Sequence, residues 1–253
     1  MKTYIYGKHP VHDALEHRSD VVEKVFLEPA QYPDIDTLAK KCGVFRMPFE
    51  EKALEKKLGE HAVHQNIAAI VDTDRLMHDF HSLLKSFDIS NDSRAMSDTK
   101  HSSAIGLVIL GEIQDPQNVG SIIRSAAAFG LSGVLIPKDR QAQLTGSVIK
   151  ASVGTAFKIP LVAIGNVNQT VRELKEKRFW VYGLSGDGKK SIRDEDFSEN
   201  SVFIVGNEAK GLREKTSEHC DVVLRIPITD TAESLNAGTS AAIAFYEWKS
   251  KQP

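Results

Sequence analysis

Apolar and polar positions in the first 75 residues alternate between short strand-like runs and charged segments of helical character. The strand-like runs, rich in Val, Ile and Phe, occupy residues 21–27, 43–47 and 66–71. The helix-forming segments between them are residues 35–41 and 50–58. Strands and helices that alternate at this spacing predict a small α/β domain.

From residue 105 onward the apolar runs become stronger and the alternation continues. Five runs are almost entirely apolar, which is typical of parallel strands covered by helices on both faces. They are residues 105–110, 133–136, 179–182, 202–205 and 222–226. The candidate covering helices are residues 118–129, 167–177 and 236–251. The last carries an apolar stripe at helical spacing, formed by Ala237, Ala241, Ala244, Phe245 and Trp248. These patterns predict a second, larger α/β domain with a parallel sheet.

A polar stretch separates the two regions. Residues 86–104 are rich in Ser, Asp and Asn and lack periodic apolar positions, as expected of a linker. We therefore expect a first domain at residues 1–75, a linker at 76–104 and a second domain at 105–253.

Composition narrows the class of protein. The chain has 253 residues, of which 41% are hydrophobic and 26% charged, close to the average of globular proteins. No apolar run approaches the ~20 residues of a membrane helix, and the N-terminus is too polar for a secretion signal. The two cysteines, Cys42 and Cys220, exclude a disulfide framework, so we expect a reducing cytoplasm. The net charge of -2 implies that any RNA-binding surface is a local patch.

The first segment with candidate chemistry, residues 111–124, follows a predicted strand and opens a helix. Asp115 before Pro116 forms a good cap and first turn, and Asn118 is a competing cap. Arg124 lies off the buried stripe of this helix. Ligands bind at such strand-to-helix turns in parallel sheets, but an ordinary cap with a solvent-facing arginine fits the pattern as well.

Two later segments have the same strand-to-loop form. In residues 204–212, Gly206 and Gly211 flank Glu208, which is either a helix-start acid or a site residue. In residues 226–236, a strand ends at a proline, and Ser234 or Asn236 precedes an alanine-rich helix that either could simply cap. All three loops meet at one edge if the sheet is parallel.

Two other patterns are weaker. Residues 183–190 almost spell a phosphate-binding loop, but Lys190 stands where the magnesium-binding hydroxyl belongs, and the following residues are acidic. We interpret Lys189, Lys190 and Arg193 instead as a candidate RNA-facing patch. His61 and His64 have no second ligand pair at metal-site spacing, so no metal site is expected.

Together, three segments carry a specific resemblance. DPQNVGSIIRSAAAFG, IVGNEAKGL and IPITDTAESLN, in this order, resemble the three motifs of the SpoU (TrmH-like) RNA 2′-O-ribose methyltransferases of the SPOUT superfamily. The match extends from residue 105 to about residue 248. IYGKHPVHDAL and HAVHQNIAAIV are similar to the substrate-binding domain, itself similar to a ribosomal protein, of longer members such as the 23S rRNA guanosine methyltransferases.

The resemblance implies a parallel sheet with a deep trefoil knot, a homodimer, and S-adenosylmethionine as cofactor. The positions that match the family's cofactor contacts are Gly206, Ile226, Leu235, Leu184, Ser185, Gly211 and Ile228. Those that match its polar site residues are Arg124, Asn118, Glu208, Ser234 and Asn236. The sequence departs from the family pattern at Ala209, at residues 237–239 and at Asn66. The first two departures adjust the cofactor loop and the start of the last helix, and neither removes a polar group from the site.

The implied activity is methylation of a ribose 2′-hydroxyl in RNA, with no metal, no membrane and no DNA involved. Because a guanidinium stays protonated, we expect Arg124 to hold a phosphate or a developing alkoxide rather than to act as a base. Substrate choice should lie in residues 1–75, which favours rRNA, most specifically 23S rRNA, over tRNA. A tRNA methyltransferase and a non-catalytic RNA-binding or ribosome-assembly protein are the alternatives.

Overall fold

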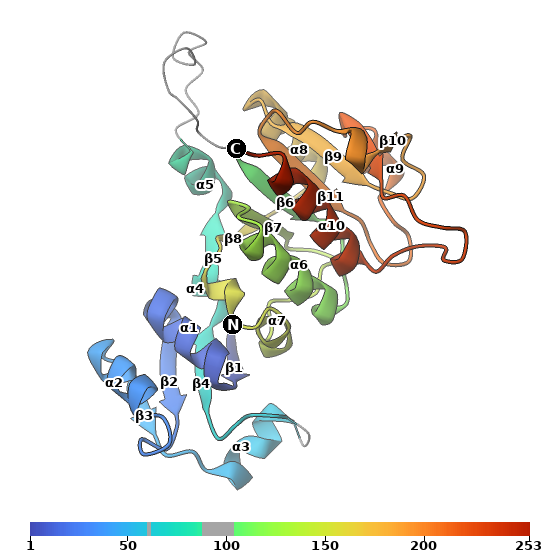
Figure 1. The fold of residues 1–253 in the computed structure, drawn as a ribbon. Helices are drawn as coiled ribbons and strands as arrows, with labels where there is room; N and C mark the ends of the chain where they lie inside the picture. The colour runs from blue at the N-terminus through green and yellow to red at the C-terminus, as the bar shows by residue number, and fades with distance from the viewer. Residues whose placement is uncertain (60–61, 88–103) are drawn as a thin grey trace.

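The N-terminal part is a small α/β domain, as predicted. The computed structural model describes residues 1–59, 62–87 and 104–253, and Figure 1 shows this part in blue. Its sheet has the order β1 (Lys2–Tyr6), β4 (Ala68–Asp72), β2 (Val22–Phe26) and β3 (Phe45–Met47). Both β1 and β2 pair antiparallel with β4, and β3 is parallel to β2. The helices of this part are α1 (Lys8–Arg18), α2 (Pro33–Lys41) and α3 (Glu51–Leu58).

The C-terminal part is built on an eight-stranded sheet in which every described pairing is parallel. In spatial order, its strands are β10 (Lys190–Ser191), β12 (Val222–Arg225), β9 (Trp180–Leu184), β11 (Ser201–Val205), β6 (Gly106–Leu110), β7 (Gly133–Pro137), β8 (Leu161–Ile164) and β5 (Met77–Asp79). The parallel sheet predicted from the apolar runs is therefore confirmed.

Helices on both faces explain why the central strands β6 and β7 lack polar side chains. Val108 and Leu110 of β6 join the core beneath α6 (Pro116–Ala128) and α10 (Ala237–Ser250). Leu107 and Ile109 point the other way, into the core beneath α8 (Val167–Glu176). Figure 1 shows α6 and α10 next to each other. Since every β6 side chain is buried, the run could not alternate with polar residues.

The predicted linker at 76–104 is wrong in its first part. After β4, the short helix α4 (Thr73–Leu76) leads into β5, which pairs with β8 at the edge of the large sheet. Helix α5 (Phe80–Ser86) follows and buries Phe80 and Leu83. β5 carries little apolar pattern because His78 and Asp79 are exposed and Met77 is only half-buried. Residues 88–103 lie outside the described part of the chain.

Several elements were not predicted from periodicity: β1, α1, β8 and α7 (Gly146–Ala151). Another short helix, α9 (Glu214–Ser217), follows the second motif. The trefoil knot that the resemblance implies stays a prediction.

The two parts share a packed junction. The backbone N–H of Gly146 donates a 3.1 Å hydrogen bond to Thr3 Oγ1. Asp13 of α1, only 8% exposed, pairs with Lys158 at 3.0 Å. Gly154 has φ 83°, and a Cβ there would collide with the Asp13 carboxylate, so glycine permits this close approach. One hydrophobic core runs from the small domain into the α6 side of the large one.

Candidate functional site

The predicted cofactor-binding residues gather around one pocket at the carboxyl edge of the parallel sheet. β9, β11 and β12 end here side by side, because β9 pairs with both of the others. The pocket has a volume of about 490 Å³. All seven predicted positions line it, together with Glu208 and Ser234: Leu184, Ser185, Gly206, Gly211, Ile226, Ile228 and Leu235.

Gly206 sets the shape of the pocket wall. A Cβ at this position would overlap the backbone of Gly211 and Leu212. The loop closes through two backbone hydrogen bonds between Asn207 and Gly211, of 3.0 and 2.8 Å. Gly211 has φ 63°, in the left-handed region that favours glycine. Both glycines of the second motif are thus required by the tight return of the chain.

A chain of side-chain hydrogen bonds joins the three motifs. Asn118 Nδ2 donates to Glu208 Oε1 at 3.0 Å, and Asn236 Nδ2 donates to Asn118 Oδ1 at 2.7 Å. Asn118 is 5% exposed, so its amide is fixed by both partners. Residues from α6, from the loop after β11 and from the start of α10 are in this way held against each other beside the pocket.

Both oxygens of the Glu208 carboxylate accept two hydrogen bonds each. Its Oε1 also accepts from the Asp115 N–H at 3.2 Å, and its Oε2 accepts from the Gln114 N–H and from Asn207 Nδ2, both at 3.4 Å. Desolvation raises the pKa of Glu208, but the hydrogen bond from Asn118 and those from backbone N–H groups outweigh it, so the pKa lies below its ordinary value. Glu208 is therefore an ionised anchor for the loops around it.

Of the candidate helix caps, Asp115 and Asn236 are confirmed, whereas Asn118 and Ser234 cap neither helix. Asp115 caps α6 by accepting from the Gln117 N–H at 2.9 Å, with Pro116 in the first turn. Asn236 caps α10 by accepting from the N–H groups of Gly238 and Thr239. Asn236 thus acts as a cap through its Oδ1 and as a link to Asn118 through its Nδ2.

Arg124 is not brought into this cluster. It lies on α6, six residues after Asn118, which corresponds to about 9 Å along the helix. Its side chain is exposed, does not line the pocket, and makes no hydrogen bond or ion pair within the described residues. Ser234 lines the pocket wall and is exposed.

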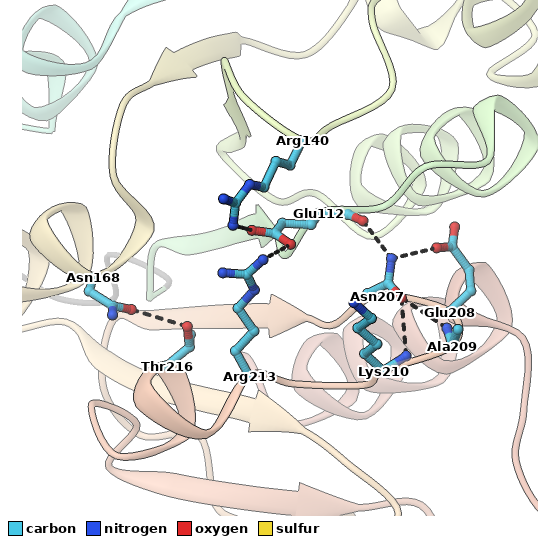
Figure 2. A network of polar contacts seen from close by, with 9 residues as sticks. All are labelled: Glu112, Arg140, Asn168, Asn207, Glu208, Ala209, Lys210, Arg213 and Thr216. Carbon is cyan, nitrogen blue, oxygen red and sulfur yellow. Dashed lines mark hydrogen bonds and ion pairs between the residues drawn. The ribbon is translucent and has the colours of Figure 1, made fainter.

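Sequence reasoning missed a second cavity, of about 870 Å³, which shares Gly206 with the first. Figure 2 shows the Glu112 carboxylate between the guanidinium groups of Arg213 and Arg140. The nitrogen-to-oxygen distances of these two ion pairs are 2.5 Å for Arg213 and 4.0 Å for Arg140. The Glu112 carbonyl oxygen accepts a 2.9 Å hydrogen bond from Asn207 Nδ2. Asn207 lies in the second motif and Glu112 in the first candidate segment, so the sequence analysis included both residues without linking them.

The weaker sequence patterns can also be placed. Residues 183–190 lead into strand β10 instead of a helix, and Lys190 pairs with Glu195 at 2.9 Å. The hydrogen bond with Glu195 raises the Lys190 pKa. His64 accepts from the Asn66 N–H at 3.0 Å and packs on Phe49, while His61 lies outside the described residues. Every helix of the described chain is too short or too polar to cross a membrane.

Comparison with known proteins extends this picture. Residues 106–246 match the SpoU rRNA Methylase family, and residues 4–77 match the domain described as RNA 2′-O ribose methyltransferase substrate binding. A 23S rRNA (guanosine-2′-O-)-methyltransferase of Xylella fastidiosa is 33% identical over 248 residues, covering 96% of this chain and 94% of the relative. That of Escherichia coli is 31% identical, covering 98% of each. An AdoMet-bound rRNA methyltransferase from Sinorhizobium meliloti has a similar fold, with a TM-score of 0.78 at 21% identity over 98% of this chain and 87% of that one.

Proposed function

Because this chain belongs to the SpoU rRNA methylase family, a family of RNA 2′-O-ribose methyltransferases, we propose that it methylates a ribose 2′-hydroxyl of 23S rRNA with S-adenosylmethionine as donor. The observation that carries the proposal is the hydrogen-bonded chain Glu208–Asn118–Asn236, which joins three motifs at the rim of the 490 Å³ pocket. The names of full-length relatives support 23S rRNA as the RNA.

The pocket fits the proposed cofactor in size and chemistry. Its volume lies within the range of small-molecule sites, ~300–1,000 Å³. The space that a Cβ would fill at Gly206 is taken up by the tight loop, which leaves backbone groups at the strand end. Gly206, Ile226 and Leu235 would hold the cofactor mainly through N–H and C=O groups. Leu184, Ser185, Gly211 and Ile228 complete the wall. The bound sulfonium supplies an activated methyl group.

The remaining tasks are to align the 2′-hydroxyl for in-line attack and to stabilise the oxygen as it loses its proton. Both oxygens of Glu208 already accept from protein donors, so we assign Glu208 and Asn118 to positioning the loops and not to proton transfer. Asn236 orients the start of α10, and we assign Ser234, in the pocket wall, to contacting the nucleophile.

In contrast to the Glu208 carboxylate, the Arg124 side chain is exposed. Its guanidinium has no partner within the described residues, carries a permanent positive charge and is exposed on α6. We assign it to holding an RNA phosphate or the developing alkoxide, because both are anions that bind a forked donor well. Its partner must then come from outside the protomer, from RNA or from a second copy.

The proposal includes a homodimer that works in the cytoplasm. Tyr246 of α10 is 57% exposed and its ring lies 6.0 Å from that of Phe129, which gives the α6–α10 side an exposed aromatic surface. Cys42 and Cys220 are free thiols, as a reducing compartment requires. The mass of the purified protein in solution tests the dimer directly.

The function is tested with labelled S-adenosylmethionine, the purified chain and undermethylated total RNA separated by size. Digestion and mass spectrometry then identify the methylated nucleoside. A labelled 2′-O-methylnucleoside in large-subunit rRNA is the expected result. Label in tRNA would keep the chemistry and contradict the assigned substrate. No label in any RNA, together with no binding of S-adenosylmethionine, would contradict the methyltransferase activity itself.

A further inference from the structure

The outer face of the small domain's sheet carries a cluster that the catalytic site does not use. The strand registers place Tyr4, Ile70, Lys24 and Phe45 in one row across four strands. Side chains in register on neighbouring strands project to the same side of a sheet. Phe26 and Met47 stand in the next row, opposite Ala68. We call Tyr4, Lys24, Phe26, Phe45 and Met47 the aromatic face.

The opposite side of this sheet is the packed one. Ile5, Val25 and Val71 alternate with the aromatic face along their strands and are at most 1% exposed within the hydrophobic core. On the outer side, Phe45 is 62% exposed and Met47 37% exposed. An exposed ring on an edge strand gains little from folding, since its apolar surface stays in water.

A lysine lies among the rings of the aromatic face. The rings of Tyr4 and Phe26 are stacked, with centroids 6.3 Å apart and planes 24° apart. Lys24 Nζ lies 5.9 Å from the centroid of Phe26 and 5.3 Å from that of Phe45. Among the residues that the structure describes, Lys24 forms no ion pair with a carboxylate, so its charge is available to an anion.

A second cation extends the face at the junction with the large domain. Lys150 of α7 places its Nζ 4.7 Å from the centroid of the Tyr6 ring and 3.2 Å from its hydroxyl. Rings and lysines therefore extend from the edge strand β3 across to β1 and onto the catalytic domain. A protein partner would favour a continuous apolar patch, whereas interleaved lysines match a polyanion that also offers flat apolar rings.

We propose that the aromatic face binds unpaired RNA bases by stacking, with Phe45 as the outermost ring and Lys24 and Lys150 neutralising the adjacent phosphates. Unpaired bases stack on exposed aromatic side chains of sheet surfaces, while bases within a duplex cannot. The inference rests on the proposed function, because the RNA bound here is taken to be the RNA that is methylated. It adds the binding mode: a single-stranded segment of the same RNA, bound on the small domain and apart from the pocket.

The test measures binding of a fluorescein-labelled single-stranded RNA dodecamer containing all four bases to the full chain, at one fixed salt concentration and without cofactor. Phe45→Leu removes the ring and keeps an apolar side chain, and we expect it to weaken binding about 5- to 140-fold, the range for one lost stacking contact. Phe45→Tyr should bind as the unmodified chain does. Trp180→Leu is the control, because Trp180 is an exposed aromatic residue, at 42%, in the other domain.

Three results would overturn the inference. The first is Phe45→Leu binding the dodecamer within twofold of the unmodified chain. The second is an equal loss of affinity for the dodecamer and for the same sequence paired in a duplex. The third is a lower solution mass for Phe45→Leu, which would make the aromatic face a contact between protein chains. Since no methyl transfer is measured, this test fails or succeeds separately from the proposed function.

Discussion

The side chain of Asn236 donates a 2.7 Å hydrogen bond to that of Asn118, across a sequence separation of 118 residues. Asn118 in turn donates to Glu208. The start of the last helix is thereby linked to the first motif through a single buried amide, and the pocket rim depends on that amide.

We expect Asn118→Ala to lower methyl transfer at least 100-fold, because the positions of Glu208 and Asn236 would no longer be coupled. It should also lower the free energy of unfolding by about 1–3 kcal/mol, since buried polar partners lose their hydrogen bonds. Single-turnover kinetics and urea unfolding measure the two effects. Gln117→Ala, at an exposed neighbouring position on α6, should change neither. Normal turnover in Asn118→Ala would contradict the positioning role.

The Glu208 carboxylate should make stability depend on acid pH. Its pKa is lower in the folded chain than its ordinary value of 4.5, so the folded state binds this proton less readily than the unfolded state. The stabilisation is therefore fully present above about pH 4.5 and is lost as the pH falls through the folded pKa. Unfolding free energies measured between neutral pH and the acid range should show this loss, and Glu208→Gln should lack its share of it. Identical pH profiles would exclude the carboxylate as the source.

Gly206→Ala should weaken cofactor binding. The new Cβ would overlap the backbone of Gly211 and Leu212, so the loop that walls the pocket must open. We expect at least a tenfold loss in affinity for S-adenosylmethionine by calorimetry, with a loss of about 1–3 kcal/mol in stability from overpacking. Gly165→Ala is the matched control, because a Cβ at that strand end meets no atom within 4 Å. Unchanged affinity in Gly206→Ala would place the cofactor elsewhere.

Arg124→Lys tests whether the forked guanidinium is needed. We expect methyl transfer to fall about 100- to 1,000-fold, because an ammonium cannot donate two parallel hydrogen bonds to an anion. Stability should stay within about 0.5 kcal/mol, since the side chain is exposed. Arg172→Lys, at an exposed position on α8, should leave both unchanged. Near-normal turnover in Arg124→Lys would show that the charge alone is enough.

The Cys220 thiol should react slowly in the folded chain. Burial raises its pKa to about 12, so very little thiolate forms at neutral pH. We expect iodoacetamide to modify Cys220 far more slowly in the native protein than in denaturant, as followed by peptide mass spectrometry. Equal rates in both states would mean that the region between α9 and β12 opens freely.

The sequence predicted those parts of the fold in which burial leaves a local pattern. β6 and β11 are buried at all five positions because helices cover both of their faces, and all of these residues except Ser201 are apolar or glycine. β5 has no such pattern, since Met77, His78 and Asp79 are strand residues only through their pairing with β8. That pairing joins positions more than 80 residues apart, which no local window detects.

The same distinction applies to the candidate site: the convergence of its strand ends could be predicted from the sequence, and its long-range hydrogen bonds could not. The convergence of Gly206, Ile226 and Glu208 follows from strand ends in a parallel sheet, which a sequence can indicate. The hydrogen bond between Asn118 and Glu208 spans 90 residues and depends on how α6 is rotated above the sheet. The second cavity depends on Glu112, whose φ of 66° is left-handed without a glycine or asparagine to signal it.

The edge strand β5 has a mechanical consequence. It follows β4 after the four-residue helix α4, and it is hydrogen-bonded into the catalytic sheet. The chain therefore passes from one sheet to the other through a short, ordered connection. The ion pair between Asp13 and Lys158 and the hydrogen bond between Gly146 and Thr3 further fix the two domains relative to each other. RNA bound to the small domain would be held at a fixed distance from the pocket. Such a molecule would measure distance, selecting the nucleotide to be methylated by how far it lies from the RNA segment bound to the small domain.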